Sequence, residues 1–222
     1  MSLARWGQPR PANGAAADAL FLRYWLFWVT LGEAVGFLAP ALALLVLGGS
    51  PVRAPAVIAA GAVEGAALGW TQATVLRVRV PALSRARWVR ATALGAAVVW
   101  FLALLPAEWA SVWQRWPATG QTLAAVVGGT VLLTVIGIAQ RTELRRHSRT
   151  AGWWIPGNAA AWCAGLLVFT AVATGLWHPG QSTALVLLIG VLAGILTMLT
   201  TALVSGVILL RLLPTKSPRQ PT

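Results

Sequence analysis

The segment that decides the fold is Ala184–Leu210, ALVLLIGVLAGILTMLTTALVSGVILL, which runs for 27 residues without a charged side chain. A transmembrane helix needs about 20 mostly apolar residues to cross the hydrocarbon core of a bilayer. The segment lacks the alternation of apolar and polar residues that marks the strands of a membrane barrel. We therefore predict that it is a membrane-spanning helix.

Five further segments meet the same criterion, at Leu20–Leu47, Pro55–Leu76, Trp88–Leu105, Gln121–Gln140 and Trp153–Trp177. The whole chain agrees, because 58% of its 222 residues are apolar and only 10% are charged. Soluble domains carry roughly 25% charged residues, and disordered chains have low hydrophobicity. We expect an all-α, polytopic transmembrane helix bundle with six spans in residues 20–212, flanked by flexible cytoplasmic tails at 1–19 and 213–222.

The distribution of Lys and Arg sets the orientation of a membrane protein. Of the 17 basic residues, all but Arg53 and Arg115 lie on the N-terminal side up to Arg23, around the loop after the second span up to Arg90, in the loop after the fourth span, or in the tail after the sixth. This asymmetry requires an even number of spans and predicts an inner (plasma) membrane protein with both termini in the cytoplasm. The basic loops are expected to contact anionic lipid headgroups. They lack the interleaved aromatic residues of single-strand binding surfaces, so no nucleic-acid partner is expected.

An internal repeat accompanies these spans. The pattern G-x-x-Q-x-x-x-L-R ends the second span at 69–77 and the fourth at 137–145, and a degenerate copy surrounds Ser205 in the sixth. Trp25, Trp88 and Trp154 each stand seven residues before a Gly or Ala in the odd-numbered spans. We predict three tandem helix hairpins, at residues 20–77, 88–145 and 153–211, about a pseudo-threefold axis along the membrane normal.

A glycine-rich span that ends in this motif, followed by a basic loop and a Trp-led span, resembles a group of bacterial six-helix membrane proteins without an established activity. The resemblance covers most of residues 25–211. It implies the six-helix architecture and carries over no functional residue. Mitochondrial carriers also contain three helix hairpins, but their P-x-[DE]-x-x-[KR] signature is missing from this chain.

Glu33 and Glu64 are the two acidic residues that fall inside predicted spans. At the rise of an α-helix, Glu33 lies about 15 Å beyond Arg23 and Glu64 about 20 Å before Arg77, near the middle of a hydrocarbon core about 30 Å thick. A charge at that depth is costly unless it is paired or hydrated, so we expect at least one of the two acids to be neutral. Either they are hydrogen-bonded structural residues, or they form a site for a proton, a cation or a small solute.

Four other polar residues lie in the spans toward the predicted cytoplasmic side: Gln72, Gln140, Asn158 and Ser205. They are candidates for hydrogen bonds that fasten one hairpin to the next, or for a polar vestibule that leads to the two acids. Three tryptophans lie deeper and are candidates for lining the interior: Trp70, Trp100 and Trp162.

Signatures of known catalytic and cofactor sites are missing from the sequence, including G-x-S-x-G, H-E-x-x-H, the P-loop and the dinucleotide fingerprint. We therefore expect no catalytic residue, metal site or cofactor. The favoured function is binding or moving a small solute or proton at Glu33 and Glu64, with a small-molecule ligand or a membrane-protein partner left open. The alternatives are a scaffold subunit of a membrane complex and a membrane-embedded enzyme without a recognisable motif.

Overall fold

The computed structural model describes residues 12–213, and all regular secondary structure in that range is helical. The helices are α1 (Ala12–Val46), α2 (Arg53–Arg79), α3 (Arg85–Glu108), α4 (Ala110–Trp113), α5 (Ala118–Leu144), α6 (Trp154–Leu176) and α7 (Thr183–Leu212), and Ala151–Trp153 form a 3-10 turn before α6. The prediction of an all-α fold is confirmed for this part of the chain.

Five of the six long helices are long and apolar enough to cross a membrane; α2 is the exception. Helix α2 packs against α3 through small residues. Gly61, Gly65 and Gly69 are buried on α2, and each lies directly against α3. Small residues of this kind let membrane helices approach closely. The sixth span therefore stays a prediction.

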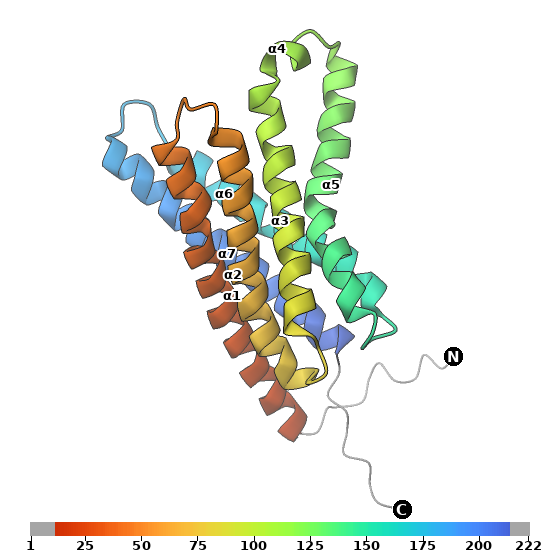
Figure 1. The fold of residues 1–222 in the computed structure, drawn as a ribbon. Coiled ribbons are helices and arrows are strands. Elements are labelled where there is room, and N and C mark those ends of the chain that lie inside the picture. The colour runs from red at the N-terminus through yellow and green to blue at the C-terminus, as the bar shows by residue number, and fades with distance from the viewer. Residues whose placement is uncertain (1–11, 214–222) are drawn as a thin grey trace, which may run out of the picture.

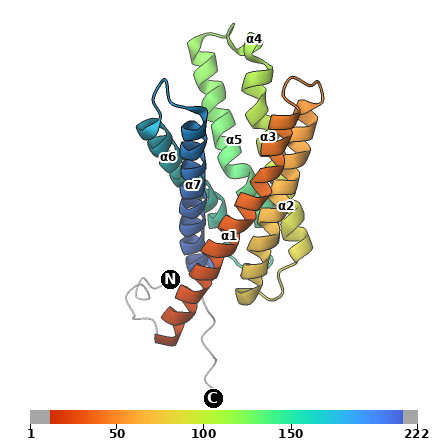
Figure 2. The ribbon, with the colours of Figure 1, turned by 90° about the vertical axis from the view of Figure 1, so that its left-hand side faces the viewer.

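Each long helix packs against its neighbours in the sequence, and α7 packs against α1, so the six helices form a closed ring (Figures 1 and 2). At one end of the ring lie the start of α1, the α2–α3 loop, the α5–α6 loop and the end of α7. We call this the basic end, because all the described arginines lie at or near it except Arg53 and Arg115, which lie at the opposite end. Toward the opposite end the α3–α5 hairpin leans away from α7 (Figure 1).

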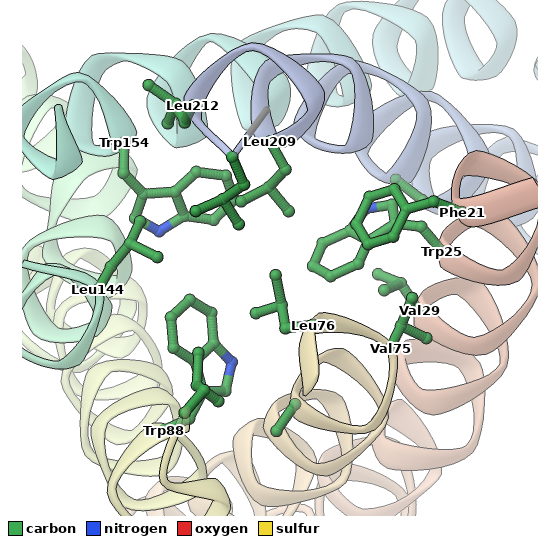
Figure 3. Close-up of a cluster of buried hydrophobic side chains, with 14 of the residues drawn as sticks. Phe21, Trp25, Val29, Val75, Leu76, Trp88, Leu144, Trp154, Leu209 and Leu212 are labelled. Carbon is green, nitrogen blue, oxygen red and sulfur yellow. The ribbon is translucent and has the colours of Figure 1, made fainter. Parts of the chain in front are cut away.

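A cluster of large side chains occupies the interior of the ring at the basic end (Figure 3). One tryptophan comes from each of α1, α3 and α6, and one leucine from each of α2, α5 and α7. We call these six the Trp–Leu cluster: Trp25, Trp88, Trp154, Leu76, Leu144 and Leu209. All six side chains have an exposed fraction of 0%, so solvent does not reach them from the basic end.

The first helix begins earlier than the sequence suggested. Residues 12–19 belong to α1, although they were expected to be part of a flexible tail. This segment contains Ala15, Ala16 and Ala17, and alanine has the highest helix propensity of all residues, so the helix extends beyond the apolar span. The remaining parts of the two expected tails, 1–11 and 214–222, lie outside the described residues.

Candidate functional site

Glu33 and Glu64 lie on the contacting helices α1 and α2, and Gly36, three residues after Glu33, lies directly against the backbone of Glu64. Glu33 stands four residues after buried Val29 and eight after Trp25, and Glu64 stands eight before Gln72. Side chains at this spacing share one face of a helix, so both acids face the interior of the ring. Eight residues correspond to about 12 Å along a helix. The acids therefore lie one layer further from the basic end than the Trp–Leu cluster.

Glu33 is the more buried of the two acids, with an exposed fraction of 5%. Within residues 12–213 its carboxyl group has neither a hydrogen-bond donor nor a basic partner. Thr30, one turn earlier on α1, has a buried hydroxyl oxygen that also lacks a partner. The interior of the ring at this level thus contains polar atoms that no other described side chain satisfies.

Glu64 is tied to α3 by a hydrogen bond of 2.6 Å that it accepts from Nε1 of Trp100. Gly61 lies one turn before Glu64 and provides the space for the indole, because a Cβ atom at this position would lie 2.0 Å from Cδ1 of Trp100. On its other side Trp100 meets Phe37 of α1, with ring centroids 6.3 Å apart. The acid pair is thus bordered by α1, α2 and α3.

The three deep tryptophans have different surroundings. Trp100 is partly buried and bonds Glu64, and Trp162 on α6 is also partly buried. Trp70 was expected to line the interior, but it is 55% exposed and stacks against the guanidinium group of Arg85, 4.5 Å away. Trp70 points outward because Gly69 and Gln72 occupy the buried face of α2 at this level.

Two of the predicted polar residues meet within the Trp–Leu cluster. Nε2 of Gln140 donates to Oε1 of Gln72 at 2.8 Å and to Oγ1 of Thr92 at 2.9 Å. Oε1 of Gln140 accepts from Nε1 of Trp154 at 2.9 Å, and Oε1 of Gln72 accepts from Nε1 of Trp88 at 3.1 Å. This buried network joins α2, α3, α5 and α6.

Ser205 and Asn158 belong to the same layer. Oγ of Ser205 accepts a hydrogen bond of 3.1 Å from Nε1 of Trp25, which joins α7 to α1. Asn158 is 4% exposed and packs against Gly137 of α5, but its Nδ2 has no partner in the described part of the chain. Gln72, Gln140 and Ser205 thus form a buried joint between helices, at a different level from Glu33 and Glu64.

Glu143 is a second buried acid besides Glu33, and the sequence assigned no role to it. Its carboxylate has an exposed fraction of 0% and accepts hydrogen bonds from the backbone N–H of Ser84 at 2.8 Å and from Nε of Arg87 at 2.6 Å. His147 lies 3.1 Å away on the same side. The residue therefore fastens the α2–α3 loop to the end of α5. Its position at the end of a predicted span gave no signal for this contact, which joins residues 56 to 59 positions apart.

A cleft of about 1200 Å³ opens at the basic end between α1, the end of α2, the α5–α6 loop and the end of α7. Its lining includes basic and aromatic side chains, and neither Glu33 nor Glu64 contributes to it. No three His, Cys, Asp or Glu residues in the described range lie together as they would in a metal site.

Comparison of the chain with protein-family models, with curated proteins and with solved structures finds no match. A fold alone does not determine a function. The function therefore has to be inferred from the buried acids and their surroundings.

Proposed function

We propose that the chain crosses a bacterial inner membrane six times, as three helix hairpins about a pseudo-threefold axis, with its basic end in the cytoplasm. Three matching hydrogen bonds support the repeat. The tryptophan that leads each hairpin donates to a polar side chain of the hairpin before it in the ring: Trp88 to Gln72, Trp154 to Gln140 and Trp25 to Ser205. The leucine four residues after each acceptor is fully buried.

The sixth span and the orientation rest on separate observations. Helix α2 lies between α1 and α3 and runs from the opposite end of the ring to the basic end (Figure 1). A helix in this position crosses whatever layer its two neighbours cross. The concentration of arginines at the basic end supports a cytoplasmic location for that end.

We propose that this membrane protein binds a proton at Glu33 and Glu64 and passes it, alone or with a small solute, through the ring. The observation that carries the proposal is Glu33, a buried residue whose carboxyl group has neither a hydrogen-bond donor nor a basic partner in the described chain. An ionised carboxylate in that position is costly. A bound proton removes the charge, and the neighbouring carboxyl of Glu64 offers the proton a second acceptor.

Access from the opposite end is the route that the geometry supports. The Trp–Leu cluster fills the interior at the basic end, whereas Glu64 is partly exposed and the helices diverge beyond it. The proton would reach Glu64 first and Glu33 second. Passage to the cytoplasm then requires a rearrangement of the Trp–Leu cluster.

The test uses the full chain in lipid vesicles. Infrared spectra recorded across a pH titration should contain a protonated-carboxyl band that Glu33→Gln removes. Vesicles loaded with a pH-sensitive dye should acidify under a membrane potential with the wild-type chain, and more slowly with Glu33→Gln or Glu64→Gln. Glu108→Gln is the matched control, because Glu108 pairs with Arg53 at the surface of the opposite end. If E33Q and E64Q match the wild-type chain in both measurements, the proposal is wrong.

A scaffold function is the second candidate, and the glycines far from the basic end favour it. A Cβ atom added at Gly128, Gly129, Gly190 or Gly194 would have nothing within 4 Å. These positions on α5 and α7 leave room for a helix of a partner protein to approach closely. A scaffold predicts that Gly190→Leu changes the mass of the assembly extracted from membranes, while E33Q leaves dye acidification unchanged.

A further inference from the structure

The cleft at the basic end is large for a small-molecule site. Its volume of about 1200 Å³ exceeds the roughly 300–1,000 Å³ of typical ligand pockets. The mouth carries basic side chains from three separate segments of the chain, Arg79, Arg149 and Arg211. The wall formed by α1 and α2 is mainly apolar and aromatic.

Two of the three arginines carry uncompensated charge. Arg79 is paired with Asp18 and donates a further hydrogen bond to the carbonyl oxygen of Leu213. Arg149 and Arg211 are exposed, and neither has an acidic partner among residues 12–213. The adjoining segments 1–11 and 214–222 add four basic residues and no acidic one. Arg149 and Arg211 are therefore available to a negatively charged group of another molecule.

The apolar wall points to the kind of molecule. Tyr24, Trp28 and Val78 line the cleft with exposed fractions of 53%, 37% and 77%. Tyr and Trp are enriched where the headgroup region of a bilayer meets the hydrocarbon. The basic mouth thus continues into an apolar surface on the outside of α1 and α2, in the direction of the lipid.

We propose that the cleft is a binding site for one anionic phospholipid. Arg149 and Arg211 donate charge-assisted hydrogen bonds to its phosphate oxygens, and one acyl chain lies along Tyr24, Trp28 and Val78. A free phosphate would leave the apolar wall empty, and an acidic peptide would place polar backbone against it. The site is independent of Glu33 and Glu64.

Native mass spectrometry of the full chain, purified with equal amounts of phosphatidylglycerol and phosphatidylcholine of identical acyl chains, measures the preference. The wild-type chain should retain phosphatidylglycerol over phosphatidylcholine. The double variant Arg149→Gln, Arg211→Gln should lose about fivefold of that ratio for each arginine. The matched control is Arg90→Gln, Arg145→Gln, which removes the same charge from exposed positions at the basic end but outside the cleft.

A second pair of variants tests the apolar wall without a change of charge. Val78→Trp should fill the cleft and lower phosphatidylglycerol retention. Val126→Trp, at an exposed position on α5, should not. The charge-conserving double variant Arg149→Lys, Arg211→Lys should keep most of the phosphatidylglycerol retention that the double-glutamine variant loses. This comparison separates loss of the binding site from loss of the fold.

Three outcomes overturn the proposal. One is equal retention of the two lipids by the wild-type chain, and another is an equal loss in the two double-glutamine variants, which would mean a general surface charge. The third is full retention of phosphatidylglycerol by Val78→Trp, or complete displacement of this lipid by millimolar inorganic phosphate. Either result would show that the acyl chain does not bind in the cleft.

Discussion

Gly61 controls the position of Trp100, and through it the hydrogen bond that Glu64 receives. Replacing Gly61 with Ala places a methyl group on the indole and forces the ring away from the carboxyl group. Overpacking of this kind costs about 1–3 kcal/mol. We expect Gly61→Ala to lower the thermal unfolding temperature in detergent, and to slow dye acidification if Glu64 acts as the entry acceptor.

A double-mutant cycle separates this effect from the general cost of a larger residue. In a Trp100→Ala background the indole is gone, so Gly61→Ala should be nearly neutral. An equal loss of stability in both backgrounds would mean that the methyl group acts through the backbone of α3 and not through Trp100.

Single residues also show how far the sequence alone can lead. Counting helical rise from the nearest arginines predicts a similar depth for Glu33 and Glu64, because depth depends only on position along a helix. The bond between Trp100 and Glu64 did not follow, since it depends on the rotation of α3 against α2. Nothing in the local pattern around Trp100 distinguishes it from Trp70, which points outward.

At the scale of helices, hydropathy located the elements and missed their ends. The third span was expected to begin at Trp88, but α3 begins at Arg85, where the side chain of Ser84 caps the helix by accepting from the N–H of Arg87. Caps and polar first turns lie outside the hydrocarbon layer, so apolarity carries no information about them. The one-turn helix α4 is too short to give a periodic signal.

Four helices depend on a single side chain, Gln140. Replacing it with Leu removes three hydrogen bonds and leaves the indole N–H of Trp154 without an acceptor in a buried layer. An unsatisfied buried donor costs about 1–3 kcal/mol, so we expect Gln140→Leu to lower the unfolding temperature clearly. Gln121→Leu at the exposed start of α5 is the control, because Gln121 bonds only the carbonyl oxygen of Trp116. Equal stability of the two variants would show that the buried network contributes little.

For the whole molecule, helices adjacent in sequence are adjacent in space and close into a ring, whereas the three-hairpin repeat stays a prediction. The recurrence of Trp and Gln identified residues that meet across hairpin boundaries, since the spacing puts them at one level of the bundle. The divergence of the α3–α5 hairpin toward the opposite end was not predictable. It reflects how side chains fill the space between helices, and the exposed outer half of α5 carries no pattern that marks it.

The proposed even number of spans is testable by labelling from one side of the membrane. After Cys163, the one native cysteine, is replaced with Ser, single cysteines are introduced at Ser50, Ala82, Arg115 and Arg145. If α2 crosses the membrane, Ser50→Cys and Arg115→Cys should react with an impermeant maleimide added to intact spheroplasts. Ala82→Cys and Arg145→Cys should react only after lysis, because the arginine-rich loops stay in the cytoplasm.

The pair that flanks α2 is decisive. Because α2 is less apolar than the other long helices, it could instead be buried among five spans without crossing the membrane. In that case Ser50→Cys and Ala82→Cys would be labelled from the same side. That result would leave five crossings and place the start of α1 and the end of α2 on opposite sides, although the structure pairs Asp18 of α1 with Arg79 of α2 at the basic end. Because an ion pair cannot join groups on two sides of a bilayer, labelling of Ser50→Cys and Ala82→Cys from the same side would contradict both the sixth span and the ring itself.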